Sequence, residues 1–541
     1  MPGNASAHVD TFTRDHLPAP ELWPVLDLAA AGLNYGPRVN ATVELLDKHL
    51  GDAQADRPAI LTDEASLSYR QLAAQVARIS AVLIDDMKLV PGNRVLLRAA
   101  NNPMMAACTL AVMRCGLVAV PTMPLLRAGE LQVVIDKARI SAALCDHRLL
   151  AEMNTAAQAC PTLTQVLHFG GPEDDTSLER LCRDRSESFA PCDTAADDPA
   201  LIAFTSGTTG KPKGTVHFHR DILAMCDLFP RHVLKPVSTD IFTGTPPLAF
   251  SFGLGGVLCF PMRVGAATLL IEKTDPAGLL AAIDRHQVTT CFTAPTFYRQ
   301  MAAAASQFKL NSLKACVSAG EALPVATRDA FKKATGLDII DGIGATEMIH
   351  IFISSPPEQA RRGTIGKVVP GYEARVVDDE MNTLPCGEIG RLAVRGPTGC
   401  RYLDDERQTN YVRDGWNLTG DTFSMDADGY FTYQARSDDM IISAGYNIAG
   451  PEVEDALLAH EAVAECGVIG ISDEERGQIV KAIVVLKPGH AGDEAMVRSL
   501  QDWTKARIAP YKYPRAIAFV DQLPRTETGK LQRFKLRTLQ A

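Results

Sequence analysis

The sequence lacks the signals of several protein classes. It has 541 residues and a formal net charge of -10, which argues against a nucleic-acid binder, since such a protein needs a net basic face. Its 13 cysteines include no Cys-x-x-Cys pair and most lie in apolar runs, as reduced core thiols do, so a zinc site has little support. The segment after Met1 has no basic stretch followed by an apolar one, so we expect no signal peptide and a cytoplasmic protein.

Long apolar runs are also scarce. Two stretches, 104–126 and 249–271, are apolar enough to consider as membrane spans, but Arg114 and Pro121 interrupt the first and Arg263 interrupts the second. We therefore expect no membrane partner and assign both stretches to buried strands and helices. With 46% hydrophobic and 22% charged residues, the composition is that of a folded globular protein.

Helical and β-rich segments alternate along most of the chain. Residues 69–83 have apolar side chains at helical spacing, and residues 94–97 follow a turn as a strand would. The alternation resumes after a polar segment, 170–198, which we expect to be a surface connection, with strand-like runs at 289–293 and 315–318. Such alternation predicts an α/β fold with largely parallel sheets.

The length predicts more than one domain. We predict a large N-terminal domain, residues 1–435, built of layered sheets and helices with a β-rich subdomain around 374–394. A small, mobile α/β C-terminal domain, residues 436–541, would follow. Residues 501–541 carry nine Lys/Arg against three Asp/Glu, so a basic tail follows an acidic body.

A loop rich in Ser, Thr, Gly and Lys, residues 205–214, directly follows the apolar run 201–204. Its hydroxyls, its lysines, and its glycines, which let the backbone approach a ligand, suit the wrapping of a polyphosphate. It is not a Walker loop, because Pro212 follows the first lysine and only two residues separate Gly207 from Gly210. A flexible surface turn is the alternative interpretation.

Further motifs follow this loop. They are 342–347 (Gly-Ile-Gly-Ala-Thr-Glu), 419–421 (Thr-Gly-Asp), 436–439 (Arg-Ser-Asp-Asp), 443–447 (Ser-Ala-Gly-Tyr-Asn) and 524–530 (Pro-Arg-Thr-Glu-Thr-Gly-Lys). With the loop, they resemble in identity and order the motifs of the adenylate-forming acyl-CoA synthetase family. The resemblance covers nearly the whole chain.

The resemblance implies a reaction in two steps. A carboxylate attacks the α-phosphorus of ATP and expels pyrophosphate, and the thiol of coenzyme A then displaces AMP. Cations and dipoles must offset the repulsion between the anionic carboxylate and the triphosphate. ATP, Mg²⁺ and coenzyme A are therefore expected.

The resemblance also implies catalytic residues. Lys530 would contact the carboxylate and the α-phosphate region, Thr346 would hydrogen-bond the α-phosphate, and Glu347 would hold Mg²⁺, which takes oxygen ligands. Taken alone, Lys530 is one of several C-terminal lysines, and the Thr-Glu pair reads as a helix cap.

The nucleotide site would draw on several segments. Asp421 would accept hydrogen bonds from the ribose hydroxyls, with Arg436 in support, although a surface ion pair explains either residue taken singly. Small residues at 320–322 and 341–343 would let the adenine lie against backbone. The ATP-binding residues implied in this way are Thr205, Ser206, Gly207, Thr208, Thr209, Gly210, Lys211, Gly320, Glu321, Asp341, Gly342, Ile343, Asp421 and Arg436.

Three assignments concern the C-terminal domain. Asp438 would be the hinge about which this domain rotates between the two half-reactions. Gly445 and Tyr446 would lie at the pantetheine tunnel of coenzyme A, where a side chain at Gly445 would crowd the cofactor. Arg476 would contact the coenzyme A phosphates, although a solvated charge among acidic neighbours explains it equally well.

The acyl pocket resembles that of the benzoate-CoA ligase branch. Flat walls and small residues suggest a short slot for an aromatic ring. His350 taken alone reads as a satisfied buried histidine, but it and Ser251 would tolerate or hydrogen-bond a polar ring substituent. The pocket residues implied are Phe250, Ser251, Phe252, Ala319, Gly344, His350 and Ile351.

Other stretches, including 91–98, 101–104 and 217–221, resemble 2-aminobenzoate-CoA ligases, so 2-aminobenzoate is the expected acid, with benzoate or a hydroxybenzoate as alternatives. Two further alternatives remain. One is an adenylating domain that serves a carrier protein, and the other is a non-catalytic ATP-binding homologue.

His217 and His219 are weak evidence for a metal site and fit core packing or tunnel lining better. A small aromatic carboxylate is the expected partner of a monomer or homodimer.

Overall fold

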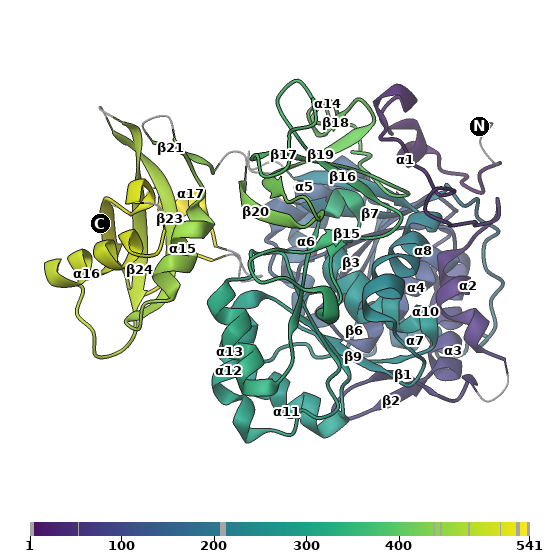
Figure 1. Ribbon diagram of the computed structural model, residues 1–541. Helices are drawn as coiled ribbons and strands as arrows, with labels where there is room; N and C mark the ends of the chain where they lie inside the picture. Colours follow the sequence, from purple (N-terminus) through teal and green to yellow (C-terminus); the bar gives the residue numbers. More distant parts are fainter. Residues whose placement is uncertain are drawn as a thin grey trace.

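The structure is a computed structural model that describes residues 5–51, 54–205, 212–436, 439–443, 446–473, 476–508, 510–525 and 531–537. In Figure 1 the elements from β21 onward form a unit beside a much larger body. The predicted boundary falls partly on residues 437 and 438, which lie outside the described residues. The division into two domains therefore stays a prediction at this point.

The first sheet of the large body has the strand order β6-β5-β3-β4-β7-β8, in which all pairs are parallel except β7 with β8. Every residue of β3, β4 and β5 is buried, as expected when helices cover both faces. Its strands are β3 (Arg94–Arg98), β4 (Val118–Thr122), β5 (Ala142–Asp146), β6 (Gln165–Phe169), β7 (Pro199–Thr205) and β8 (Lys213–Phe218).

The second sheet has the order β15-β14-β13-β12-β11-β9-β10-β1-β2. Strands β1 and β9 to β13 are parallel to one another. At the two edges the pairs β1–β2, β13–β14 and β14–β15 are antiparallel. Its strands are β1 (Pro58–Leu61), β2 (Ser66–Ser68), β9 (Ile241–Gly244), β10 (Ala267–Leu269), β11 (Thr290–Thr293), β12 (Ala315–Ala319), β13 (Ile339–Gly344), β14 (Ile351–Ser354) and β15 (Lys367–Val368).

An antiparallel sheet forms the predicted β-rich part of the body. It consists of β16 (Glu373–Val377), β17 (Gly390–Arg395), β18 (Val412–Arg413), β19 (Trp416–Met425) and β20 (Phe431–Arg436). The C-terminal unit has a sheet of its own, in which β25 joins β24 in parallel. Its strands are β21 (Ile441–Ser443), β22 (Tyr446–Ile448), β23 (Val463–Asp473), β24 (Gly477–Leu486) and β25 (Ala516–Phe519).

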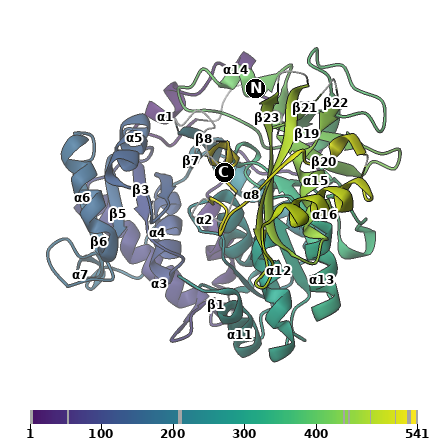
Figure 2. The same cartoon turned by 90° about the vertical axis from the view of Figure 1, so that its left-hand side faces the viewer.

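Local sequence signals explain where helices begin. Ser68 and Gln71 form a capping box at the start of α3, and Asn102 caps α4 just before Pro103. Figure 2 shows α3 to α7 around the first sheet and α11 to α13 below the C-terminal unit. The helices are α1 (Phe12–Asp15), α2 (Ala41–Leu45), α3 (Tyr69–Ala81), α4 (Pro103–Arg114), α5 (Ala128–Ala138), α6 (Leu150–Ala159), α7 (Leu178–Cys182), α8 (His219–Asp227), α9 (Ser251–Gly253), α10 (Phe260–Val264), α11 (Pro276–His286), α12 (Pro295–Ala304), α13 (Val325–Thr335), α14 (Gln408–Tyr411), α15 (Gly450–Leu458), α16 (Glu494–Lys505) and α17 (Arg533–Leu536).

The structure confirms the predicted α/β class. The two apolar stretches form buried helices and strands, and no helix within the described residues is long and apolar enough to cross a membrane. All 13 cysteines lie within the described residues as free thiols.

The segment 170–198 is more than the surface connection we expected. It contains α7 and ends in fully buried Asp198, which accepts hydrogen bonds from the backbone N–H groups of Ala7 and Ala195.

Candidate active site

The predicted catalytic pair lies in a tight corner between β13 and β14. Gly344 ends β13, where an added Cβ would lie 2.6 Å from the carbonyl oxygen of His350, so a side chain does not fit. Thr346–Met348 form one 3₁₀ turn. Buried Ile349 then reverses the chain with φ 66° and ψ −37°, a strained conformation for a β-branched residue. The corner therefore fixes the backbone on both sides of Glu347.

Glu347 is buried and its carboxylate is held from one side. The Tyr402 hydroxyl donates a hydrogen bond to Glu347 Oε1. The Lys213 ammonium donates to the same hydroxyl at 2.8 Å and lies 3.6 Å from Oε1. Within the described residues no hydrogen bond reaches Glu347 Oε2. The carboxylate therefore keeps one oxygen for a further ligand.

Thr346 is held through its backbone. His217 Nε2 lies 2.8 Å from the Thr346 carbonyl oxygen, and it must be the donor because a carbonyl only accepts. His217 Nδ1 faces Asp221 Oδ2 at 3.8 Å, and Asp221 pairs with Arg401. All three side chains are fully buried. A buried charged network thus stands behind the catalytic corner.

Asp421 and Arg436 face each other on neighbouring strands β19 and β20. Arg436 Nη1 lies 3.1 Å from Asp421 Oδ1, and the two residues are register partners. Burial raises the pKa of Asp421, and the Arg436 charge opposes that effect. The pair offers a carboxylate that a ligand hydroxyl can approach from the remaining side.

The residues expected around the adenine end two neighbouring parallel strands. Ala319 ends β12 beside Gly342 of β13, and Gly320 follows with φ +87°. Carboxyl ends of parallel strands are where open α/β sheets bind ligands. Glu321 lies beside this edge, where it accepts a hydrogen bond from Thr296 at 3.3 Å.

The expected acyl pocket is lined by aromatic side chains around His350. Its ring centroid lies 4.5 Å from that of Phe260 and 5.8 Å from those of Phe229 and Phe252. Among the described residues, neither ring nitrogen of His350 has a hydrogen-bond partner. Burial lowers the pKa of His350 to about 3, so the imidazole is neutral at physiological pH.

The pocket residues Ser251 and Phe252 begin a helical segment that continues as a π-helical turn at Leu254–Cys259. Ile351 starts β14 and packs against Gly342, where an added Cβ would lie only 2.7 Å from Ile351 Cδ1. Of the residues expected at the acyl pocket, Phe252 and Gly344 lie against His350, and Ile351 lies against Gly342, the register partner of Ala319. Phe250 and Ser251 directly precede Phe252 at the start of α9.

Several expected site residues lie outside the described residues. They are Ser206, Gly207, Thr208, Thr209, Gly210, Lys211, Asp438, Gly445 and Lys530. Thr205 and Lys213, which flank the phosphate loop, are register partners at the ends of β7 and β8. Tyr446 starts β22, and Arg476 lies in the turn from β23 to β24, where its backbone N–H donates to Asp473 at 2.9 Å.

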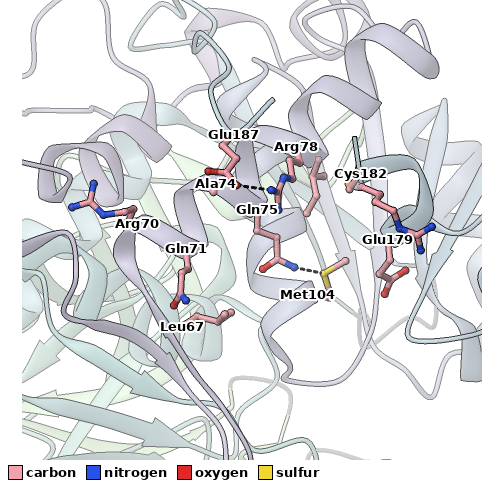
Figure 3. A pocket seen from close by; sticks show the side chains of 12 residues that line it. Leu67, Arg70, Gln71, Ala74, Gln75, Arg78, Met104, Glu179, Cys182 and Glu187 are labelled. Carbon is pink, nitrogen blue, oxygen red and sulfur yellow. Dashed lines mark hydrogen bonds and ion pairs between the residues drawn. The ribbon is translucent and has the colours of Figure 1, made fainter. Parts of the chain in front are cut away.

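A groove along α3 is separate from these residues. Figure 3 shows its lining, in which Gln75 of α3 meets Met104 of α4 and Arg78 meets Glu187. The groove encloses about 430 Å³. Its arginines serve ion pairs, Arg70 with Asp56, Arg78 with Glu187 and Arg183 with Glu173. We assign it no chemistry.

Comparison with known proteins identifies the chain. The family model described as AMP-binding enzyme matches residues 47–401, and that described as AMP-binding enzyme C-terminal domain matches residues 452–530. The chain therefore belongs to the AMP-binding enzyme family and is an AMP-forming acid–thiol ligase, which uses ATP, Mg²⁺ and coenzyme A. Within the family it falls in the benzoate-CoA ligase branch.

Two sequence relatives and one solved structure carry that placement. Benzoate–CoA ligase of Thauera aromatica is 36% identical over 93% of this chain and 96% of its own. The 4-hydroxybenzoate–CoA/benzoate–CoA ligase of Rhodopseudomonas palustris is 32% identical over 92% and 94%. The crystal structure of the anthranilate CoA ligase AuaEII in complex with anthranoyl-AMP has 35% identity, a TM-score of 0.88 and coverage of 93% of this chain and 98% of that one.

The observed geometry fits Mg²⁺ bound with ATP. Mg²⁺ takes one or two carboxylates and completes its shell with phosphate oxygens and water. Glu347 offers one oxygen without a hydrogen bond, and no cluster of three His, Cys, Asp or Glu side chains occurs in the described part of the chain. The nucleotide phosphates would therefore supply most of the remaining ligands. Bound there, the ion would neutralise phosphate charge.

Sequence reasoning missed Tyr402, the contact of Lys213 with its hydroxyl, and the contact of His217. Tyr402 is 55 residues from Glu347, so no local pattern connects the two. His217 donates from Nε2 to the Thr346 carbonyl, while His219 accepts at Nδ1 from the backbone N–H of Ala41. The spacing of His217 and Asp221, four residues apart, is the one local signal that was available.

Proposed function

We propose that the protein activates an aromatic carboxylate, with 2-aminobenzoate as the acid that its pocket fits best. The acid and ATP would give aryl-AMP and pyrophosphate, and coenzyme A would then give aryl-CoA and AMP. The names of the relatives and of the anthranoyl-AMP complex support an aromatic acid. The unpaired ring nitrogens of His350 support a polar ring substituent.

The choice of acid rests on His350, whose two buried ring nitrogens make no hydrogen bond among the described residues. A buried polar atom without a partner costs free energy, and a substrate substituent that supplies the partner recovers it. Phenylalanine rings surround the imidazole, and the backbone of Phe252 is the one polar group that acts on its pKa. An amino or hydroxyl group on the ring of the acid would supply the imidazole with a partner. A neutral imidazole presents one donor and one acceptor, which suits an aniline.

Other residues of the chain would bind ATP and Mg²⁺ and stabilise the reacting charges. Lys530 would offset the charge of the carboxylate and α-phosphate, Thr346 would hydrogen-bond the phosphate, and Glu347 would hold Mg²⁺. Asp421 and Arg436 would bind the ribose, residues 205–211 would bind the phosphates, and residues 320–322 and 341–343 would wall the adenine. Support comes from the register of Ala319 with Gly342 on neighbouring strands, and from the charge of Glu347, which acts on the pKa of Asp421.

We further propose two domains, 1–435 and 436–541, with Asp438 as the hinge and Gly445, Tyr446 and Arg476 toward coenzyme A. The separate family matches support this division. So does a hydrophobic core in the C-terminal unit drawn only from residues 441–519. The free thiols support a cytoplasmic location.

A panel of acids tests the proposal. Purified enzyme with ATP, Mg²⁺ and coenzyme A is assayed for AMP and aryl-CoA with benzoate, 2-aminobenzoate, hydroxybenzoates and phenylacetate. We expect the highest kcat/KM with 2-aminobenzoate. His350→Phe should lower that value about tenfold or more, the cost of about one lost polar contact, and change benzoate much less.

Each alternative has its own outcome. A kcat/KM for benzoate far above that for 2-aminobenzoate would assign the protein to benzoate. Acid-dependent pyrophosphate release without transfer to coenzyme A would favour a carrier protein as acceptor. Absence of acid-dependent pyrophosphate release with every acid would favour a non-catalytic ATP-binding protein.

A further inference from the structure

Tyr402 joins two charged groups on separate elements. Its side chain is 1% exposed, and its hydroxyl accepts from Lys213 Nζ at 2.8 Å while donating to Glu347 Oε1. The Lys213 ammonium also lies 4.8 Å from the centroid of the Tyr402 ring. The hydroxyl therefore uses its donor on the carboxylate and an acceptor lone pair on the ammonium.

The backbone of Tyr402 is fixed to the strand that carries Lys213. Val216 donates to the Arg401 carbonyl at 2.8 Å, Leu403 donates to the Gly214 carbonyl at 2.9 Å, and Thr215 and Tyr402 form an isolated antiparallel bridge. Residues 401–403 thus lie along β8, joined to it by this bridge and two backbone hydrogen bonds. The phenol has little freedom to leave Glu347.

We propose that Tyr402 is a positioning residue for nucleotide binding, which holds the Glu347 carboxylate and the Lys213 ammonium in a fixed relation so that the pair receives Mg²⁺ and the ATP phosphates together. The inference rests on the proposed role of Glu347. Tyr402 occupies Oε1, so Oε2 is the oxygen left for the ion. Partners of a metal ligand orient it, and their loss commonly weakens metal affinity 10- to 100-fold.

The hydroxyl also keeps the lysine and the glutamate from closing into a direct, hydrogen-bonded ion pair. Lys213 Nζ is 3.6 Å from Oε1, beyond hydrogen-bond distance, whereas a direct ion pair would bring the atoms to about 2.8 Å. Without the hydroxyl, Lys213 and Glu347 would approach each other. The carboxylate would then be less available to Mg²⁺ and the ammonium less available to phosphate.

Tyr402→Phe tests the inference, and Tyr411→Phe is its matched control. The Tyr411 ring packs 5.7 Å from that of Tyr402, but its buried hydroxyl makes no hydrogen bond among the described residues. Calorimetry measures ATP binding without acid or coenzyme A, once with Mg²⁺ and once with EDTA. We expect Tyr402→Phe to weaken binding about tenfold with Mg²⁺ and by a clearly smaller factor in EDTA, where only the displaced Lys213 contributes, and Tyr411→Phe to change neither.

Two outcomes would overturn the inference. Equal losses with Mg²⁺ and in EDTA would show a merely structural role, and no loss in either condition would show no role. If wild-type binding does not depend on Mg²⁺, or Glu347→Gln does not change that dependence, the proposed role of Glu347 fails first. A response to Glu347→Gln but not to Tyr402→Phe would defeat only the inference about Tyr402.

A double variant covers the case in which Tyr402→Phe folds poorly. In Tyr402→Phe/Glu347→Gln no buried carboxylate is left without its donor, so the fold is less perturbed. If Tyr402 acts through Glu347, the double variant should bind Mg²⁺-ATP within about twofold of Glu347→Gln alone. A further tenfold loss would show that Tyr402 acts independently of the carboxylate, contrary to the inference.

Discussion

At the scale of single residues, burial decides the charge of Asp341. This residue lies within β13, with 6% of its surface exposed. Burial raises its pKa to about 7, although the Arg328 charge and the backbone N–H of Gly342 act in the opposite direction. In the unfolded chain the same group titrates near 3.8. A residue expected only as an adenine wall is therefore also a source of pH dependence.

The first prediction concerns Asp341→Asn. Between about pH 4 and pH 7 the folded protein holds a proton at Asp341 that the unfolded chain releases, so stability falls as the pH rises through this range. Asparagine keeps the acceptor for Gly342 and has no charge to bury. The variant should gain on the order of 2 kcal/mol in free energy of unfolding at pH 8 and little at pH 4, measured by urea denaturation.

Asp338→Asn is the control, because Asp338 is only partly buried and pairs with Lys332 at the surface. It should show no gain that grows with pH. If Asp341→Asn followed the pH profile of the wild type, Asp341 would have to be charged in the folded protein at neutral pH.

Residues that belong to one local motif could be predicted from the sequence, whereas residues brought together only by folding could not. Glu347 and Thr346 were identifiable because a local motif contains them, and β11 and β12 were identifiable as apolar runs. Tyr402 was not, because its partners Lys213 and Glu347 are brought to it only by folding of distant segments. The unpaired state of His350 likewise depends on four elements that meet around one ring.

At the scale of elements, the buried pair of Asp221 and Arg401 joins α8 to the segment beside β8. Arg401 also lies over the Phe218 ring, 3.9 Å from its centroid. Burial acts to raise the pKa of Asp221, but the Arg401 charge and His217 outweigh it and lower the pKa to about 2. Both charges are therefore present in the folded protein at neutral pH.

The second prediction separates breaking this pair from replacing it. Asp221→Asn should destabilise the protein by about 3–5 kcal/mol, because it leaves the Arg401 charge buried and unpaired. Asp221→Leu/Arg401→Met should recover most of that loss, since neither charge is then buried. Urea unfolding measures both variants. A double variant no more stable than Asp221→Asn would mean that the pair itself is strongly stabilising.

At the scale of the whole molecule, Glu465 links the C-terminal unit to the body. It lies 3.2 Å from Arg299 of α12, whose guanidinium also donates to the Ala464 carbonyl at 2.5 Å. Glu465 pairs at 2.8 Å with Arg525, which lies 3.6 Å from Glu321. The start of the lysine motif is thereby placed beside Glu321 at the expected adenine edge.

The third prediction is that Glu465→Gln weakens this arrangement. Loss of two partly exposed ion pairs is worth about 1 kcal/mol. If the arrangement serves adenylation, acid-dependent pyrophosphate–ATP exchange should slow about threefold to tenfold, with less effect on transfer from preformed aryl-AMP to coenzyme A. Asp502→Asn, which breaks an exposed pair with Lys505 on α16, should change neither rate. Slowing of the transfer step alone would assign the contact to the second half-reaction.

The corner at Ile349 has a consequence for the diversification of such enzymes. Because the chain reverses there, Glu347 points toward Tyr402 and Lys213, whereas His350 points into a cage of phenylalanines. A rigid boundary therefore separates two neighbouring side chains with unrelated tasks. With His350 facing the acid as proposed, substitutions on its side would alter which acid is accepted without displacing the carboxylate on the other side, so new substrate ranges would evolve while the nucleotide chemistry is inherited intact.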